Sequence, residues 1–301
     1  MFSGGIGSWA AAKRVAQQHG TDDLFLLFTD TKIEDEDLYR FLPEAAANVG
    51  GALVWLADGR TPWDVFEDVR FLGNTRVAPC SHILKQQVAR RWVAENCHPE
   101  DSVLYVGIDW TESHRLEGAR TGWSPYAVEA PLCEAPFVTK ADLLVELEAS
   151  GIAAPRLYGM GFAHNNCGGG CVRSGQAQFA LLYERLPETF AAWESGEERI
   201  RSFLNKDVAI LRDRTGGETR PLPLAEFKKR IAPKDYDEFE FGGCGCFLDE
   251  SFSHAESAFP QIPDQEPHEC YVHPEGCIKR HSLGRCPGDH YDSIPNYESQ
   301  S

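Results

Sequence analysis

The sequence predicts an α/β fold, a doubly wound parallel sheet followed by a helical C-terminal extension. Three short apolar runs, each bounded by polar or turn residues, are typical of buried parallel strands. Helix-forming stretches lie between them, and this alternation favours a sheet with helices on both faces. The three runs are residues 23–30 (DLFLLFTD), 52–58 (ALVWLAD) and 102–109 (SVLYVGID).

The stretches between the strands carry helical signals. Residues 8–19 are rich in helix formers, and Gly20 follows them at a position typical of a helix end. Residues 35–48 and 80–96 carry apolar residues at spacings of three and four, the period of one helix face. We therefore expect a first α/β domain over residues 1–135.

The rest of the chain has a different character. Thr139 is a good N-cap for a helix over residues 139–150, and helical patterns resume over residues 174–204. These features predict a helical, cysteine-containing extension over residues 136–250. From residue 251 to 301 the apolar content falls while Pro, His, Cys, Asp and Ser rise, which predicts a poorly ordered tail unless a metal ion holds it.

Charge and composition narrow the partners. The chain has 301 residues, with 29 Lys and Arg against 46 Asp and Glu, and a net charge of -17. A surface of this charge repels phosphates, so stable nucleic-acid binding is disfavoured. No stretch approaches the ~20 apolar residues of a membrane helix, and the N-terminus has no signal segment. We expect a cytoplasmic protein that does not bind membranes.

A glycine-rich loop opens the first predicted helix. Glycines let the backbone approach a phosphate closely, and the free amides at a helix N-terminus then face the anion. The alternative is a glycine-rich turn without a ligand. The predicted nucleotide-binding residues of this loop are Ser3, Gly4, Gly5, Gly7 and Ser8.

Several motifs carry a resemblance to a known family. The loop SGGIGS resembles the SGGxDS pyrophosphate loop of the adenine nucleotide alpha-hydrolase superfamily, which includes the N-type ATP pyrophosphatases. Later motifs, in the same order, resemble its phosphoadenosine phosphosulfate (PAPS) reductase-like branch, and the resemblance covers roughly residues 1 to 250. These motifs are Asp30-Thr31, residues 79–85 (PCSHILK), Gly107-Ile108-Asp109 with Glu112, His114 and Arg115, and residues 164–171 (HNNCGGGC).

The resemblance implies an enzyme that uses ATP or PAPS, with Mg²⁺ screening the phosphates. In one chemistry, ATP is cleaved at its α-phosphate and a substrate is adenylated. In the other, a cysteine thiolate attacks an adenylyl-sulfate, and a thiol reductant or sulfur donor takes part. A nucleotide-binding partner or regulatory protein without turnover is the remaining hypothesis. The resemblance adds Asp30, Thr31 and Gly107 to the nucleotide-binding residues.

Three residues are the catalytic candidates. Cys80 is a possible nucleophile, or a small buried residue at a helix start. Lys85 follows it on a predicted helix, where it reaches a phosphate or sulfate, or stays a solvated surface residue. Arg115 lies beyond the end of a predicted strand and suits bidentate phosphate recognition; the alternative is an exterior ion pair with Glu112 or Glu117.

Two positions depart from the family pattern. Gly7 stands where the ATP pyrophosphatase loop usually has Asp, which weakens any metal-linked carboxylate role there; Asp30 is a candidate replacement. Only Met1 and Phe2 precede the loop, whereas the family has an apolar strand at that place. We expect that this first, central strand is truncated here, because its absence would leave backbone groups of its neighbours unpaired.

Four of the ten cysteines form glycine-flanked pairs: Cys167 with Cys171, and Cys244 with Cys246. Four thiolates suit zinc or an iron–sulfur cluster, so we predict that they bind one metal centre. A redox dithiol and a purely structural role are the alternatives. The tail adds Cys270, Cys277, Cys286 and several histidines, which indicate either a further zinc site or adventitious metal affinity.

Overall fold

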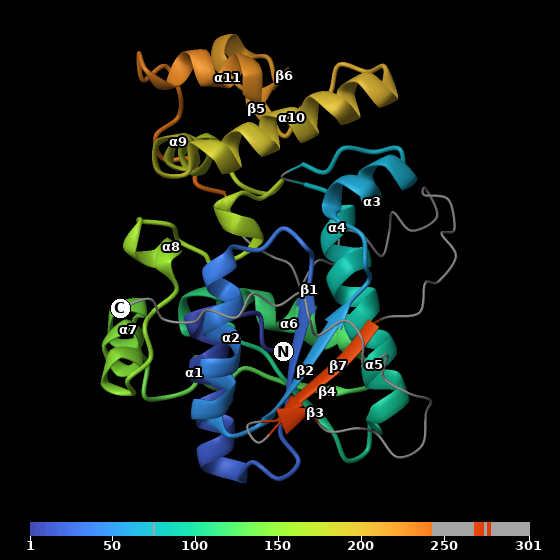
Figure 1. Cartoon of the computed structure of the whole chain (residues 1–301), viewed down its shortest axis with the longest axis vertical. Coiled ribbons are helices and arrows are strands. Elements are labelled where there is room, and N and C mark those ends of the chain that lie inside the picture. Colours follow the sequence, from blue (N-terminus) through green and yellow to red (C-terminus); the bar gives the residue numbers. More distant parts are fainter. Residues whose placement is uncertain (75, 243–267, 274–275, 278–301) are drawn as a thin grey trace.

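Two parallel strand pairs lie at the centre of the molecule. The computed structural model describes residues 1–74, 76–242, 268–273 and 276–277, and shows a mixed α/β protein (Figure 1). Strand β1 (Phe25–Asp30) pairs with β2 (Ala52–Ala57), and β3 (Val103–Tyr105) pairs with β4 (Ala127–Glu129). Both pairs are parallel, as the strand–helix alternation predicts.

Residues 1 and 2 connect the two strand pairs. The backbone N–H of Phe2 donates to the carbonyl of Leu27 at 2.7 Å, and the amino group of Met1 donates to the carbonyl of Tyr105 at 2.8 Å. Met1 and Phe2 do not belong to any described strand. The described strands thus show two parallel pairs, and a continuous doubly wound sheet is not shown by them.

Helices cover both faces of the β1–β2 pair. Leu26 and Phe28 share one core with α1 (Ile6–His19), α2 (Glu36–Val49) and α7 (Lys140–Ala149). Leu27 points to the opposite face, because side chains alternate along a strand. There it packs with α5 (Val88–Asn96) and α6 (Leu116–Trp123). Leu143 and Leu147 of α7 lie in the same core as Trp9, although they follow residue 135.

Short elements connect these layers and carry much of the site. Helix α3 (Pro62–Asp68) has a capping box between Thr61 and Asp64. Thr139 caps α7 in the same way, through Asp142, which confirms its predicted role. The remaining short elements are α4 (Pro79–Ser81), the π-helical turn η1 (His82–Gln87), the 3-10 turns η2 (Trp110–Arg115) and η3 (Pro131–Cys133), α8 (Arg156–Gly159) and the 3-10 turn η4 (Cys167–Gly169).

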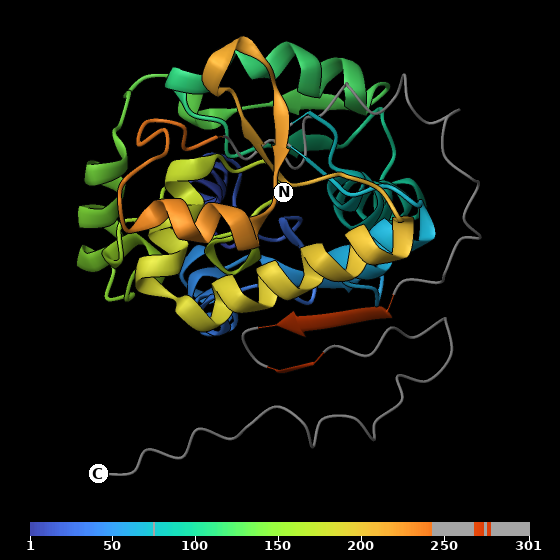
Figure 2. The same ribbon diagram turned by 90° about the horizontal axis from the view of Figure 1, so that it is seen from above.

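The extension has its own core, above the strands in Figure 1. It contains α9 (Gln176–Arg185), α10 (Pro187–Leu204) and α11 (Leu224–Ile231), together with a hairpin of β5 (Leu211–Asp213) and β6 (Arg220–Leu222) around the 3-10 turn η5 (Thr215–Gly217). Figure 2 shows α10 running across this end of the molecule. The helical character predicted for residues 174–204 is confirmed.

One buried carboxylate organises the extension. Glu197 of α10 is 1% exposed and accepts hydrogen bonds from the backbone N–H groups of Ile210 and Leu224, at 2.8 and 2.6 Å. It therefore fixes the hairpin and the start of α11 to α10. Burial raises the pKa of Glu197 to about 7, even though both hydrogen bonds favour the charged form.

The predicted tail is described only in part. Strand β7 (His268–His273) pairs antiparallel with β2, and β8 (Gly276–Cys277) pairs with β7. The other residues of the tail, including Cys286, lie outside the described residues. No helix in the described part of the chain is long and apolar enough to cross a membrane.

Candidate functional site

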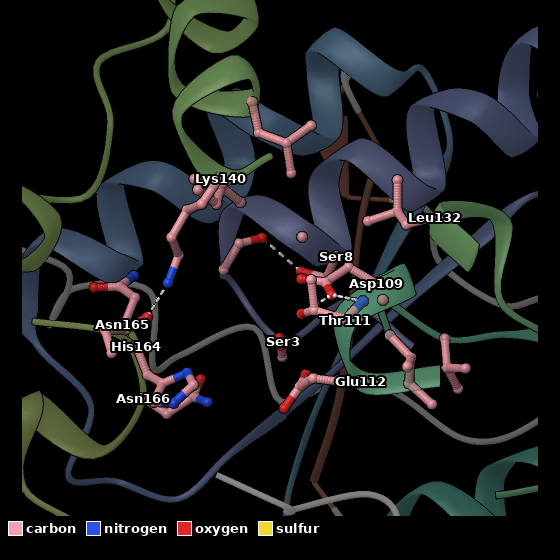
Figure 3. Close-up of a pocket in the computed structure, with 18 of the residues that line it drawn as sticks. Ser3, Ser8, Asp109, Thr111, Glu112, Leu132, Lys140, His164, Asn165 and Asn166 are labelled. Atoms are coloured by element: carbon pink, nitrogen blue, oxygen red, sulfur yellow. Dashed lines mark hydrogen bonds between the residues drawn. The ribbon is translucent and has the colours of Figure 1, made fainter. Parts of the chain in front are cut away.

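A pocket of about 520 Å³ opens where α1 begins and β3 ends. Its wall includes Ser3, Gly5, Gly7 and Ser8 from the glycine-rich loop, and residues 106–109 from the end of β3. Residues 138–140 and 163–166 close the opposite side (Figure 3). The pocket thus lies beyond the carboxyl end of a parallel strand, where open α/β sheets bind ligands.

The first turn of α1 faces this pocket with free backbone donors. Gly5 is the N-cap, and the first turn contains no acidic residue. The N–H of Ile6 donates to the Tyr158 hydroxyl at 3.3 Å, and Ser8 Oγ donates to the carbonyl of Gly5 at 2.8 Å. The amides of Gly7 and Ser8 have no partner within the helix, because the first N–H groups of any helix lack one. This arrangement suits an anion.

Two glycines permit the close approach of α1 to the end of β3. A Cβ atom on Gly107 would lie 2.9 Å from the backbone nitrogen of Ser8. One on Gly7 would lie 3.3 Å from the carbonyl oxygen of Gly107. Gly7 stands where the family pattern has Asp. A side chain at this position would crowd the carbonyl oxygen of Gly107, so close packing accounts for the glycine in this chain.

The structure brings most of the predicted nucleotide-site residues together. Seven of them line the one pocket: Ser3, Gly5, Gly7, Ser8, Lys85, Gly107 and Arg115. Gly4 has a φ of +77° and a carbonyl that accepts a hydrogen bond from a pocket residue, Asn165. Cys80, Asp30 and Thr31 are not among the residues that line the pocket.

Lys85 is a buried residue in the π-helical turn η1. It is 4% exposed, and its Nζ lies 3.3 Å from a carboxylate oxygen of Glu34. The solvated-surface alternative for Lys85 is therefore wrong. π-helical turns occur frequently at functional sites, because they shift side chains out of the normal helical register.

Glu34 is the central acceptor behind the pocket. Besides Lys85, it accepts a hydrogen bond from the Thr31 hydroxyl at 2.9 Å and one from the backbone N–H of Cys167. Thr31 thus hydrogen-bonds to Glu34 behind the pocket and is not among the residues that line the pocket wall. The carboxylate joins the end of β1, the turn that carries Lys85 and the cysteine loop.

Asp30 stabilises the turn after β1. It is 3% exposed, and its carboxylate accepts hydrogen bonds from the backbone N–H and Nζ of Lys32 and from the Tyr39 hydroxyl at 3.0 Å. The carboxylates that line the pocket are instead Asp109 and Glu112. Asp30 therefore does not replace the missing loop Asp in this structure.

Both basic and acidic side chains line the pocket. Arg115 pairs with Glu112 at 2.6 Å, the ion pair considered as its alternative, while still lining the pocket. Lys140 donates to the carbonyl of Ala163, and Figure 3 shows it reaching across towards that segment. Burial lowers the pKa of Lys140. Asp109 accepts hydrogen bonds from Thr111 and so caps the 3-10 turn η2.

Asn165 contributes an unused acceptor. The residue is 1% exposed, and its Nδ2 donates to the carbonyl of Gly4 at 3.0 Å. Its Oδ1 is buried and has no hydrogen-bond partner within the described part of the chain. Buried polar atoms in proteins are nearly always paired, so an unpaired oxygen at a pocket wall indicates a ligand donor.

The cysteine loop lies behind Lys85. The Cys167 and Cys171 thiols are hydrogen-bonded, and this contact, burial and Glu34 hold the pKa of Cys167 well above its usual range. Burial also raises the pKa of Cys80 to about 12, with the neighbouring Cys167 adding to the rise. The Cys80 thiol is therefore protonated at neutral pH.

The predicted metal centre is described only in part. Cys244 and Cys246 lie outside the described residues. The described segment before them ends at Gly242, which pairs with Ser174, three residues after Cys171. In residues 1–74 and 76–242, no group of three or more His, Cys, Asp or Glu side chains is arranged to hold a metal ion.

Comparison with known proteins gives no relative. No family model, no curated protein and no solved structure matches this chain.

Sequence reasoning missed several residues of the pocket. Nothing in the sequence marked Glu34 as a site residue except its position four residues after Asp30. Asn165 and Asp109 stand inside quoted motifs, so the resemblance could have identified them. Tyr158 and Lys140 lie in the extension, and nothing local in the sequence relates them to the loop.

Proposed function

We propose that this protein binds ATP or a related adenine nucleotide, such as PAPS, in the pocket at the start of α1. The observation that carries the proposal is the first turn of α1, which opens into the pocket without an acidic side chain of its own. Its free amides and helix dipole favour a phosphate group. Lys85, Lys140 and Arg115, which come from η1, α7 and η2, add positively charged side chains to the wall.

The rest of the wall suits the other parts of a nucleotide. Ile6, Leu132 and Leu143 supply apolar surface for a base. The free Oδ1 of Asn165 accepts a hydrogen bond from an exocyclic amine or a ribose hydroxyl. The wall thus combines apolar surface with polar groups that can orient a ligand, as small-molecule sites do.

The pocket carboxylates fit Mg²⁺. This ion is commonly held by one or two carboxylates together with substrate phosphates, and Asp109 and Glu112 both line the pocket. Mg²⁺ would neutralise phosphate charge next to Glu112, whose own charge is offset by Arg115. Gly7 does not contribute a ligand.

Adenylation is the chemistry that these residues support best. An acceptor oxygen attacks the α-phosphorus, the bond from that phosphorus to the bridging oxygen breaks, and pyrophosphate leaves with the electron pair. The amides of α1 and Lys85 hold the pyrophosphate, and Arg115 stabilises charge at the reacting phosphate. The proton of the acceptor passes to solvent or to a pocket carboxylate.

Reduction of an adenylyl-sulfate is the second chemistry. It requires a thiolate and a thiol reductant, and Cys80 is protonated in this structure because burial raises its pKa to about 12. Cys167 and Cys171 belong to this proposal as a dithiol, or as ligands of a zinc or iron–sulfur centre together with Cys244 and Cys246. Four thiolates suit either centre.

The finer fold assignment also belongs to the proposal. We infer that β2, β1, residues 1–2, β3 and β4 follow one another in a single twisted sheet of the doubly wound type. Helices on both faces of β1 and the hydrogen bonds of Met1 and Phe2 support this order. A non-catalytic nucleotide-binding protein is the remaining functional candidate, favoured by the absence of a carboxylate at Gly7.

Incubation of the purified protein with labelled ATP, and separately with PAPS and a thiol reductant, tests these candidates. Pyrophosphate release identifies adenylation, and sulfite release identifies reduction. Saturable binding without either product identifies the non-catalytic protein. If neither nucleotide binds, the proposal is wrong.

The site itself is tested with Gly5→Val. A Cβ atom at Gly5 lies 3.2 Å from the Tyr158 hydroxyl, at the pocket wall, so the larger side chain occupies the phosphate position. We expect nucleotide affinity to fall by roughly 100-fold, the scale of losing several charge-assisted hydrogen bonds. Gly122→Val, in α6 outside the pocket, is the matched control and should retain binding.

A further inference from the structure

An exposed tryptophan lies at the edge of the α1 pocket. The chain has seven tryptophans, all of them within the described residues, and Trp110 is the only one that is exposed, at 42%. It is the first residue of η2 and lines the pocket. Aromatic side chains contribute much of the energy of protein cores and interfaces when they are buried. An indole ring left open beside a pocket therefore favours contact with a ligand.

Two contacts fix the indole ring of Trp110 in place. Its Nε1 donates to the carbonyl of Val138 at 3.0 Å. Val138 also lines the pocket, so this hydrogen bond joins η2 to the segment before α7 at the pocket edge. Phe137 packs against the indole, with the ring centroids 5.9 Å apart and the planes at 54°. Because the only polar group of the indole is already paired, its open surface offers apolar and π contacts alone.

Phe137 extends this surface away from the pocket. It is 62% exposed and is not among the residues that line the pocket. Trp110 and Phe137 thus form an aromatic surface that begins at the pocket wall and continues into solvent, and we call this pair the aromatic rim. Planar rings bind to such surfaces in offset-stacked or edge-to-face geometry.

The aromatic rim is close to the residue that contacts the reacting phosphate in the proposed adenylation. Trp110 and Arg115 are the first and last residues of η2, and both line the pocket. At about 2 Å per residue of a 3-10 turn, their backbones are roughly 10 Å apart. Figure 3 shows Thr111 and Glu112 of the same turn at the pocket wall. A molecule held on Trp110 is therefore within reach of a phosphate held by Arg115.

The base of the nucleotide has apolar surface elsewhere in the pocket. Ile6, Leu132 and Leu143 line the pocket and are 1%, 0% and 6% exposed, respectively. The aromatic rim is open to solvent instead. A second molecule can reach the rim from solvent while a nucleotide fills the pocket, so the rim suits the partner of the nucleotide in the reaction.

We propose that the aromatic rim binds the acceptor of the adenylation, and that this acceptor carries a planar aromatic ring. The proposal rests on the proposed function, because without adenylation there is no acceptor. The ring stacks on the indole of Trp110, and a nucleophilic oxygen attached to the ring faces the α-phosphate beside Arg115. Holding both reactants in this geometry removes the entropic cost of bringing them together during the reaction.

NMR titration of the full chain with benzamide, and separately with cyclohexanecarboxamide, tests the ring contact. The two probes share the amide group and differ in having a planar or a puckered ring. We expect benzamide to bind at least about fivefold more tightly, the lower end of what stacking on one aromatic side chain contributes.

Variants of the rim locate this contact. Trp110→Ala should weaken benzamide binding by about fivefold or more, and Phe137→Ala by a smaller factor. Phe137→Ala also keeps the test valid if Trp110→Ala does not fold. Phe25→Ala is the matched control, because Phe25 is 48% exposed and lies at the amino end of β1, outside the pocket. It should change the affinity less than about twofold. Equal affinity of the two probes, or no loss in either rim variant, would overturn the ring contact.

A titration with a saturating non-hydrolysable ATP analogue separates this proposal from the nucleotide proposal. We expect the benzamide affinity to stay within about twofold, because the nucleotide and the ring occupy different surfaces. Displacement of benzamide by the analogue would assign the rim to the base of the nucleotide and overturn the acceptor assignment. If the analogue does not bind while benzamide binding still depends on Trp110, the ring site remains, and the acceptor assignment falls with the nucleotide proposal.

Discussion

Two loops of the chain contain three glycines each but differ in their surroundings. Residues 3–8 (SGGIGS) line an open pocket, whereas residues 167–171 (CGGGC) are packed into the core of the extension. A Cβ atom on Gly170 would lie 2.3 Å from the Trp193 indole nitrogen, and Gly168 and Gly169 have positive φ angles of +61° and +84°. In residues 167–171 glycine allows close packing, whereas in residues 3–8 it leaves the loop open to the pocket.

The difference lies in what surrounds each loop. Beside Gly5, the nearest atom to an added Cβ is a hydroxyl group at a pocket wall. Beside Gly170, it belongs to a rigid ring held by other aromatic side chains, Trp63 and Phe179. Glycine density alone therefore does not identify a ligand loop; the neighbours decide. Glu34 joins the cysteine loop to Lys85, which lines the same pocket as residues 3–8.

The largest expected effect comes from breaking that connection. Lys85→Met leaves Glu34, 1% exposed, without its cation, so the free energy of unfolding should fall by about 3–5 kcal/mol. Lys85→Met combined with Glu34→Gln removes both charges and should recover part of the loss. Urea unfolding of the two variants measures this. A double variant less stable than the single one would show that the pair is not coupled.

The next effect contrasts the loops directly. Gly170→Ala forces a methyl group against Trp193 and should lower the free energy of unfolding by about 1–3 kcal/mol or more. Gly5→Ala meets the Tyr158 and Ser3 hydroxyls without a severe clash, so we expect a change below about 1 kcal/mol. Urea denaturation under one set of conditions compares them. Equal destabilisation would remove the distinction between a packed and an open loop.

One pH effect on stability should arise on the side of the cysteine loop. Glu197 lies one turn beyond Trp193 on α10, and its pKa is raised from 4.5 to about 7 by burial. Between these values the folded state binds more protons than the unfolded state, so stability falls as pH rises through this range. The loss should amount to roughly 1–3 kcal/mol by pH 8.

Glu197→Gln should remove this component of the pH dependence. We expect the variant to be less stable than the parent at low pH. The amide nitrogen of its new side chain is itself a donor, and it would face one of the two backbone N–H groups that donate to Glu197. Comparing hydrogen exchange of the variant and the parent should place this component in α9 and α10. An unchanged pH profile in the variant would assign the effect to another group.

A small effect on stability is expected where Asn165 contacts the pocket loop. Asn165→Ala removes one hydrogen bond to Gly4, which costs about 0.5–1.5 kcal/mol. Nucleotide affinity should fall more, by about 10-fold, because the free Oδ1 is lost as well. Parallel thermal unfolding and nucleotide titration separate these effects. Full nucleotide affinity in the variant would show that Oδ1 does not contact the ligand.

Local patterns were enough for the first two strands. Runs 23–30 and 52–58 contain β1 and β2, because continuous apolar residues bounded by polar ones fit a strand buried on both faces. The run 102–109 was predicted too long. It forms only Val103–Tyr105, since the chain at Gly107 leaves the β4 partner and passes close to α1. Strand β4, with three residues, is too short to give a pattern.

The sequence predicted those residues of the candidate site that belong to local motifs. The loop, Lys85 and Arg115 were identified from motifs, and all of them line one pocket. Tyr158 and Asn165 contact residues more than 150 positions earlier in the chain. Such contacts depend on tertiary packing, and neither periodicity nor composition encodes them. Asp30 was assigned by its place after a strand, which does not reveal that its carboxylate turns towards Lys32 and Tyr39.

The hydrogen bond from Asn165 to Gly4 has a consequence for synthesis on the ribosome. The glycine-rich loop emerges before the residues that close its pocket, and the last of these, such as Asn165, follow Gly4 by 161 positions. A nascent chain therefore exposes the loop long before the pocket exists, and fragments that end before residue 166 should lack a nucleotide-binding site. Ligand binding can assist only the last stage of folding, after the extension has begun to emerge.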